Sequence, residues 1–206
     1  MLVNVSIDNL NALSKESIVF KNTYVTQAVC APARASIMTG LYPHAAGMPR
    51  NKLVMPEEVE TIANMVSADY KKAYFGKWHL GNEVINQRGF DEWASGMETL
   101  RDEYTEEEYL DMDTSYHEFL VANGFEPDEL LLGNKIFSDE MRAALPAEFQ
   151  MASFFANRAE TFIKENKDNP FVMYVSFLEP HPPWTGPYDG VHDPQQVPIE
   201  PTFLKR

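Results

Sequence analysis

The sequence has 206 residues, of which 44% are hydrophobic and 12% aromatic, so the chain can form a buried core. Its formal net charge of −14 argues against a nucleic acid as partner, because phosphate binding by counterion release needs a basic surface. The sequence contains no apolar stretch of membrane-spanning length and no charged and apolar leader, so we expect no membrane span. Any anion must therefore bind locally, where a few cations converge on one pocket.

The first residues predict a helix that is followed by a strand. Leu10 and Leu13 recur at helical spacing, which predicts an amphipathic helix that ends within residues 9–15. The next apolar run, at residues 17–20, is short and follows polar residues, so we expect a buried strand there.

Cys30, the only cysteine of the chain, is expected at the start of a second helix. Pro32 suits the first turn of a helix, where its missing N–H is no loss, and Gly40 suits a helix end. Free backbone N–H groups and the positive end of the helix dipole would therefore lie beside Cys30. With Arg34 one turn further on, this end of the helix is predicted to attract an anion.

The middle of the sequence predicts a third helix and a second strand. Pro56 and the two glutamates after it suit the first turn of a helix, with Ile62, Met65 and Val66 on its apolar face. Residues 72–75 are expected to form a strand that delivers the polar residues after it to the edge of a sheet.

The remaining elements complete an alternating α/β pattern. The acidic stretch 94–147 interrupts the pattern, and we expect a solvated helical insertion there in preference to a cation-binding or substrate-facing lid. Residues 148–164 predict a helix, and the continuous apolar run 171–177 is typical of a strand in the middle of a sheet. We expect an α/β fold with a mostly parallel sheet flanked by helices, in a single domain at 1–206. Ligands of such sheets bind beyond the carboxyl ends of the strands, so the polar residues there should converge.

Three segments resemble the signatures of type I sulfatases. Residues 30–34 read Cys-Ala-Pro-Ala-Arg, residues 76–81 read Gly-Lys-Trp-His-Leu-Gly, and residues 179–184 read Glu-Pro-His-Pro-Pro-Trp. They follow one another in the order that the family uses, which a chance match to one short signature would not give. The resemblance implies an alkaline phosphatase-like sulfatase fold, of which this chain would be an incomplete, internal piece.

The same resemblance implies a nucleophile that derives from Cys30. In type I sulfatases the cysteine of Cys-x-Pro-x-Arg is oxidised to formylglycine by a maturation enzyme, which would be one partner of this protein. Hydrated formylglycine has two hydroxyl groups on one carbon, so one can attack sulfur and deprotonation of the other can release sulfate. The implied activity is hydrolysis of a sulfate monoester, and the substrate is a small molecule or a carbohydrate.

The resemblance also implies roles for four other signature residues. Arg34 would orient the diol, and Lys77 would hold a sulfate oxygen. His79 would be the base for sulfate release, and His181 would donate a proton to the leaving oxygen. Lys77 and His181 would thus contact the substrate together with Trp184, which fits a sugar or aryl platform and a core position equally well. Structural roles are expected for the other histidines, His44, His117 and His192.

A divalent metal is the cofactor that the resemblance implies, with Ca²⁺ expected and Mg²⁺ as the alternative. Cys30, as formylglycine, would be one metal ligand. The aspartate pairs of the family have no counterpart in this sequence, so the remaining ligands are expected outside this chain. The family works mostly in periplasmic, secreted or lysosomal settings, and the sequence itself indicates no compartment.

Two other functions stay open beside sulfate ester hydrolysis. A formylglycine-dependent phosphonate monoester or phosphodiester hydrolase shares the first signature, because the same pocket tolerates tetrahedral phosphorus. A chain without its metal ligands could also retain the anion pocket as a noncatalytic binding module. A comparison of turnover between an aryl sulfate and an aryl phosphonate distinguishes the first alternative from a sulfatase. Calcium binding distinguishes the second, because an intact enzyme should bind calcium and a noncatalytic chain should bind it poorly.

Overall fold

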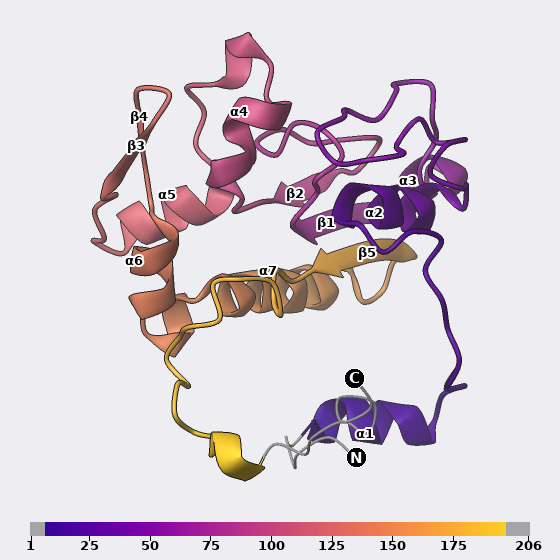
Figure 1. Cartoon of the computed structure of the whole chain (residues 1–206). Coiled ribbons are helices and arrows are strands. Elements are labelled where there is room, and N and C mark those ends of the chain that lie inside the picture. The colour runs from indigo at the N-terminus through magenta and orange to yellow at the C-terminus, as the bar shows by residue number, and fades with distance from the viewer. Residues whose placement is uncertain (1–6, 197–206) are drawn as a thin grey trace, which may run out of the picture. The chain divides into compact units, whose positions relative to one another are not determined.

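The structure, a computed structural model, describes residues 7–196, and at positions 102, 103 and 196 it describes the backbone alone. The chain divides into two compact units. One contains residues 25–187, and the other combines residues 1–24 with 188–206. The first unit holds the sheet and every residue with a predicted site role (Figure 1). None of the helices within residues 7–196 is long and apolar enough to cross a membrane.

The smaller unit contains one of the predicted helices but not the predicted strand. Helix α1 (Asp8–Lys15) forms where the apolar spacing predicted a helix, although none of its residues is buried. The prediction of a strand at 17–20 is wrong, because this segment is irregular and Ile18 and Phe20 are exposed. A strand needs a neighbour for its backbone hydrogen bonds, and no described residue pairs with this segment.

The central feature of the larger unit is a parallel three-stranded sheet in the order β2 (Glu92–Ala94), β1 (Lys71–Gly76) and β5 (Phe171–Ser176). The predicted strands at 72–75 and 171–177 are therefore confirmed. The middle position belongs to β1, however, and not to β5 as the apolar run suggested. The side chains of β5 are mostly half-buried, because only one edge of this strand is paired among the described residues.

Helices cover both faces of this sheet. Ala73 and Phe75 of β1 pack on one face in a cluster with helix α7 (Met151–Asn166). Tyr74 lies between them in sequence and packs on the opposite face, in a second cluster with helix α2 (Cys30–Thr39). Because successive strand residues point to opposite faces, this alternation builds the three-layer α/β arrangement seen in Figure 1.

Tyr74 is the centre of an aromatic layer beneath α2. The register of the sheet places it beside Trp93 of β2 and Tyr174 of β5. Its ring stacks on both, with centroid distances of 4.9 Å and 5.3 Å, and meets Trp78 edge-on at 5.1 Å. This packing fixes the end of β1, from which the second signature continues.

The expected third helix is much shorter than its sequence pattern suggested. Pro56 and its glutamates do not start a helix, and α3 (Ile62–Met65) has only four residues. Thr61 and Asn64 form a capping box that sets the helix start at residue 62, and Val66 is already extended. The predicted apolar face is therefore wrong, because the two ends of α3 are exposed.

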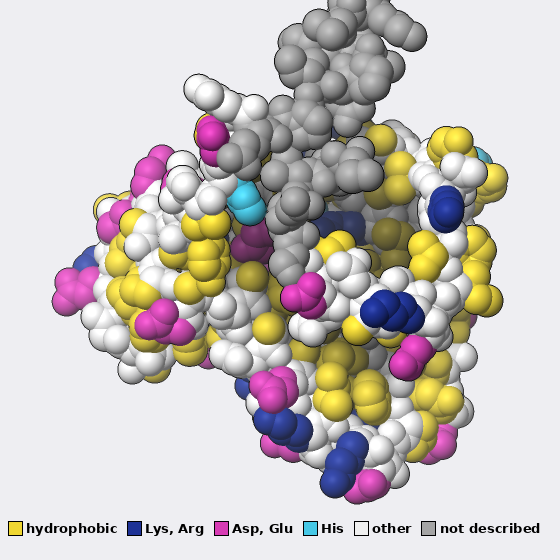
Figure 2. All heavy atoms as spheres, turned by 90° about the horizontal axis from the view of Figure 1, so that it is seen from below, with side chains coloured by type: hydrophobic (Ala, Val, Ile, Leu, Met, Phe, Trp, Pro, Cys, Tyr) yellow, Lys and Arg dark blue, Asp and Glu magenta, His cyan; other side chains and the backbone are white. Residues whose placement is uncertain are grey.

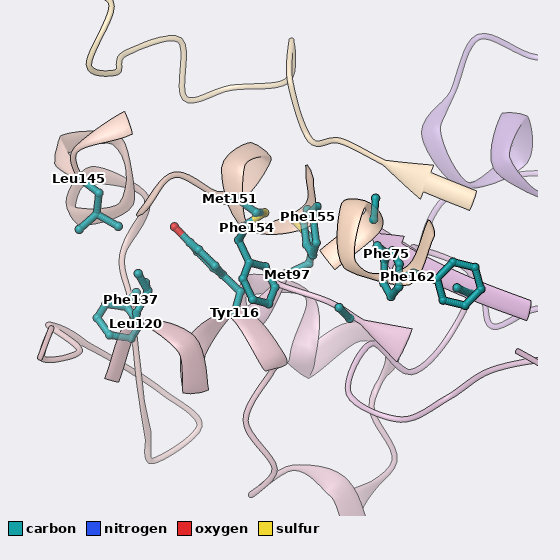
Figure 3. Packing of buried hydrophobic residues seen from close by; sticks show 13 residues of the cluster. Phe75, Met97, Tyr116, Leu120, Phe137, Leu145, Met151, Phe154, Phe155 and Phe162 are labelled. Carbon is teal, nitrogen blue, oxygen red and sulfur yellow. The ribbon is translucent and has the colours of Figure 1, made fainter. Parts of the chain in front are cut away.

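The acidic stretch 94–147 contains three helices and one hairpin. Its elements are 3-10 turns at Glu98–Leu100 and Glu107–Tyr109, α4 (Arg101–Tyr104), α5 (Ser115–Ala122), β3 (Glu129–Leu131), β4 (Asn134–Ile136) and α6 (Asp139–Ala144). The segment is not simply solvated, since Tyr116, Leu120 and Phe137 lie in the α7 cluster (Figure 3). A further 3-10 turn, Ala147–Phe149, leads into α7, close to the predicted helix at 148–164. That these residues form one partial catalytic domain stays a prediction.

Candidate active site

A pocket of about 270 Å³ opens where the carboxyl ends of β1 and β5 face the start of α2. Its lining comprises Cys30, Ala33, Arg34, Ile37, Lys77, Tyr174, Ser176, Leu178 and His181. Residues from all three signatures thus meet in one place, although they are far apart in the sequence. Figure 2 shows basic and acidic side chains mixed over the part of this face that is not grey, and no broad basic patch is visible there.

Cys30 is the first residue of α2 and is half-buried. The residue before it, Val29, is extended, so the helix begins at the cysteine itself. The next backbone N–H, that of Ala31, donates to Oδ1 of Asn51 at 2.9 Å. The predicted placement of Cys30 at a helix N-terminus is therefore what the structure has, with one free N–H group already satisfied by a side chain.

Arg34 connects α2 to the ends of two strands. Its Nη1 donates to the carbonyl oxygen of Lys77 at 2.6 Å and to Oγ of Ser176 at 2.5 Å. Sequence reasoning did not select Ser176, although a hydroxyl at the end of an apolar strand was a usable signal. The guanidinium group consequently has a fixed position at the pocket wall, whatever ligand the pocket holds.

Gly76 allows the two strand ends to approach closely. Its φ is +122°, and a Cβ atom there would lie 2.0 Å from the carbonyl oxygen of Ser176. The same oxygen accepts a hydrogen bond from the N–H of Lys77 at 3.0 Å. Only glycine fits this position, and its absence of a side chain lets Lys77 begin the turn at the pocket.

Lys77 places a cation in a poorly solvated position. Its side chain is only 4% exposed, yet it lines the pocket. Burial lowers the pKa of Lys77, and Arg34 acts in the same direction, whereas Cys30 and Glu83 raise it. An anionic ligand in the pocket would therefore stabilise the charged ammonium group strongly.

His79 is buried and does not line the Cys30 pocket, and one of its ring nitrogens is unsatisfied. Only 5% of the residue is exposed, and Nδ1 has no hydrogen-bond partner among the described residues. Tyr104 packs edge-on against the ring at 5.2 Å. Burial, with Lys77, Arg34 and His181 adding to it, lowers the pKa of His79 to about 4. The imidazole is therefore neutral near pH 7 and can accept a proton.

Glu83 is a buried carboxylate that sequence reasoning missed. Its Oε1 accepts from the N–H of His79 at 2.7 Å, and Oε2 accepts from the N–H of Trp78 at 3.2 Å. Burial raises the pKa of Glu83 to about 7, against the lowering effect of these two hydrogen bonds. Its one sequence signal, a carboxylate two residues beyond the second signature, is equally typical of a solvated turn.

His181 and Trp184 lie in the loop after β5. His181 lines the pocket, and its Nδ1 lies 2.9 Å from the carbonyl oxygen of Pro182, which accepts a hydrogen bond when Nδ1 carries the hydrogen. Trp184 is 79% exposed, which rules out the core position, and its Nε1 donates to Pro180 at 3.1 Å. It does not line the Cys30 pocket, so its role as a ring platform stays a prediction.

The profile of the sulfatase family matches residues 4–196, nearly the whole chain. The chain belongs to the sulfatase family. Its relatives include the uncharacterized sulfatase YidJ of Escherichia coli, which is 32% identical over 90% of this chain and 35% of its own length. An ulvan-active sulfatase of Formosa agariphila is 29% identical, over 96% of this chain and 36% of its own length. This sulfatase chain thus spans about a third of the curated relatives that it matches.

Solved structures support the fold of this chain. The phosphonate monoester hydrolase SpPMH from Silicibacter pomeroyi superposes with a TM-score of 0.67 at 21% identity, over 95% of this chain and 41% of that one. A structure in complex with its substrate D-glucosamine-2-N,6-O-disulfate gives a TM-score of 0.53 at 23% identity, over 88% and 31% of the two chains. The alkaline phosphatase-like fold is therefore shown, and the chain covers part of it.

The described residues of this sulfatase do not make a complete site for the divalent metal of the family. No carboxylate lines the Cys30 pocket, so the lining lacks the side chains that Ca²⁺ prefers, and Cys30 is the one predicted ligand in it. Glu98, Asp113 and His117 lie together elsewhere, but Arg101 is already 3.4 Å from Asp113 and 3.9 Å from Glu98. His117 is 2.6 Å from Glu98, which agrees with the structural role expected for this histidine.

Proposed function

We propose that the protein to which this chain belongs hydrolyses a sulfate monoester in the Cys30 pocket. The observation that carries the proposal is the convergence of Cys30, Arg34 and Lys77 on one pocket. A buried His79 follows Lys77 by two residues, close enough for Lys77 and Arg34 to lower its pKa. Two fixed cations suit a group with negative charge on its nonbridging oxygens. Curated relatives include an ulvan-active sulfatase and an N-acetylglucosamine-6-O-sulfatase, which favours a sulfated carbohydrate as substrate.

In the first step, the sulfo group passes from the substrate to position 30, and each residue around the pocket has a separate role. Lys77 holds a nonbridging sulfate oxygen, and Arg34 orients the hydrated group at position 30 relative to the sulfate. Hydrated formylglycine at position 30 supplies one hydroxyl as nucleophile and a second that can be deprotonated. The bond from the hydroxyl oxygen to sulfur forms as the bond between sulfur and the ester oxygen breaks, and the proton of the attacking hydroxyl passes to water. His181, protonated on both ring nitrogens, donates the proton of Nε2 to the ester oxygen, and the alcohol leaves.

His79 acts in the second step. Its neutral imidazole takes the proton of the remaining hydroxyl, so that sulfate departs and the aldehyde returns for hydration by water. Burial lowers the pKa of His79 most, and the nearby cations lower it further. Bound sulfate offsets their charge and raises that pKa, which makes His79 a stronger base when the base is needed.

Ca²⁺ remains the proposed metal, but no step is assigned to it. The group at position 30 is the one predicted ligand in the pocket lining, and no carboxylate is present there to join it. The phosphonate monoester hydrolases share the fold of this chain at low identity, so the fold does not separate sulfur from phosphorus substrates.

A comparison of substrates tests the proposed function. The whole protein is produced together with the maturation enzyme, and release of the phenol from an aryl sulfate and an aryl phosphonate is measured with added Ca²⁺. We expect the sulfate to be the better substrate and Cys30→Ala to abolish its turnover. Faster turnover of the phosphonate, or undiminished turnover by Cys30→Ala, would overturn the proposal.

A further inference from the structure

The buried carboxylate of Glu83 meets two consecutive backbone N–H groups of the signature turn. It is 1% exposed, and its two oxygens lie 2.7 Å from the nitrogen of His79 and 3.2 Å from that of Trp78. We propose that Glu83 is a positioning residue, whose carboxylate holds this turn in the shape that presents Lys77 and His79 to the Cys30 pocket. The inference deepens the proposed function and rests on it for its kinetic part.

The turn needs an acceptor at this place because it leaves the sheet. Strand β1 ends at Gly76, and the N–H of Lys77 still donates to Ser176 of β5. The N–H groups of Trp78 and His79 pair with no strand and donate to Glu83 instead. His79 has φ +60°, a left-handed conformation that costs a residue with a side chain about 1–3 kcal/mol. Two buried N–H groups without acceptors would cost about 1–3 kcal/mol each. Glu83 accepts from both and so stabilises the strained turn.

The turn directs neighbouring side chains of the second signature to different places. Trp78 is completely buried in the cluster beneath α2, next to Tyr74. Lys77, by contrast, reaches the pocket, and His79 lies near enough to Lys77 for the lysine charge to lower its pKa. A change in the peptide planes at 78 and 79 would therefore move the cation and the base together, relative to Cys30.

Glu83 is itself anchored, so it can act as a fixed support. The indole Nε1 of Trp93, on strand β2, donates to the backbone carbonyl of Glu83 at 2.8 Å. Trp93 in turn stacks on Tyr74 in the neighbouring strand. Glu83 does not line the Cys30 pocket, and both of its carboxylate oxygens are occupied, so it acts through the turn and not on the substrate.

Glu83→Gln is the decisive variant, because an amide keeps the shape but can accept only one of the two hydrogen bonds. Glu98→Gln is the matched control, since Glu98 is also buried and also accepts a backbone N–H, that of Phe137, at 3.1 Å. In the matured whole protein, we expect Glu83→Gln to lower kcat about 100-fold per folded molecule and to retain a covalent sulfo group, as His79→Ala should. Glu98→Gln should lose stability and keep its kcat.

An amide measurement tests the geometry without any turnover. Protein labelled with ¹⁵N at tryptophan and histidine reports the N–H groups of Trp78 and His79. Hydrogen bonds to a carboxylate shift amide protons downfield, so we expect Glu83→Gln to move one or both of these signals upfield, and Glu98→Gln to leave them in place. Unchanged signals in Glu83→Gln would overturn the inference.

The two readouts separate this inference from the proposed function. If the wild type releases no sulfate but the amide signals move as expected, the proposed function fails and the support of the turn stands. If the wild type is active and Glu83→Gln has a normal kcat, the inference fails alone. If Glu83→Gln does not fold, Glu83→Asp replaces it as the test variant, because the shorter side chain keeps the carboxylate but moves it away from the turn by one methylene. A normal kcat in Glu83→Asp would then contradict the positioning role.

Discussion

Arg34 on helix α2 donates a hydrogen bond to the carbonyl oxygen of Lys77, at 2.6 Å. The same oxygen accepts from the hydroxyl of Tyr74 at 2.5 Å, so the first and second signatures are joined through one peptide group. Two donors on one acceptor fix the orientation of that peptide. The cation of the first signature thus positions the lysine of the second.

This relationship predicts different effects for the two donors. Arg34→Gln removes the charge and the link to Ser176, so we expect the affinity of the whole protein for inorganic sulfate to fall at least about tenfold. Tyr74→Phe removes one hydrogen bond and should cost about 1 kcal/mol of unfolding free energy, with sulfate affinity retained. Calorimetric titration and urea unfolding measure the two. Equal loss of sulfate affinity in both variants would contradict the role given to Arg34.

Gly76 should tolerate no side chain. In Gly76→Ala the new Cβ would collide with the carbonyl oxygen of Ser176, and the positive φ adds strain, so we expect a loss of more than about 3 kcal/mol of unfolding free energy. Gly124 is the control, because its φ is +86° but nothing lies within 4 Å of its Cβ position. Gly124→Ala should cost about 1 kcal/mol. Similar losses in urea unfolding would show that the close approach is unimportant.

Lys77 and His79 should affect different steps of the reaction. Lys77→Ala removes the cation beside sulfate and should slow the first release of alcohol, whereas His79→Ala should release one equivalent of alcohol and then stop. Stopped-flow measurement of the phenol from an aryl sulfate distinguishes a slow first turnover from a burst. A burst in neither variant, or in both, would refute this division of roles.

The low pKa of His79 predicts a pH dependence of stability. Its folded pKa is about 4 and its ordinary value is 6.5, so below pH 6.5 the unfolded chain binds a proton that the folded protein does not. Stability therefore falls as the pH drops from 6.5 towards 4. Between about pH 7 and about pH 5, the wild type should lose about 2 kcal/mol relative to His79→Gln.

The comparison of the wild type with His79→Gln separates the effect of His79 on stability from that of Glu83. Glu83, whose folded pKa is raised to about 7, contributes in the opposite direction, but it is present in both proteins. His44→Gln is the control, because His44 is exposed. Urea unfolding at the two pH values gives the free energies. A constant difference between the wild type and His79→Gln would mean that His79 is not neutral in the folded protein.

The sequence predicted those parts of the site that depend on local pattern. Pro32 and Gly40 bound α2 closely enough to place Cys30 at its start, and the apolar runs located β1 and β5. The prediction that the signature residues converge on one site followed from the parallel sheet alone, because the carboxyl ends of its strands lie at one edge. These features are set by residues near one another in the sequence, which is why pattern and propensity reveal them.

The features that sequence reasoning missed depend on partners elsewhere in the fold. The run at 17–20 reads as a strand, yet a strand forms only where another edge is available. Glu83 gains its importance from the left-handed backbone of His79, which no residue pattern indicates. Likewise, the aromatic residues of the acidic stretch turn inward because α7 offers them a surface, as Figure 3 shows for Tyr116 and Phe154.

The central claim is that position 30 carries the group that takes up sulfate. It is tested most directly by peptide mass spectrometry of the whole protein with His79→Ala, matured during expression and exposed briefly to an aryl sulfate. Before exposure, the peptide that contains position 30 should carry an aldehyde that reacts with a hydrazide, and afterwards it should carry one sulfo group. An unmodified Cys30 thiol under maturing conditions, or a sulfo group on another peptide, would contradict the account.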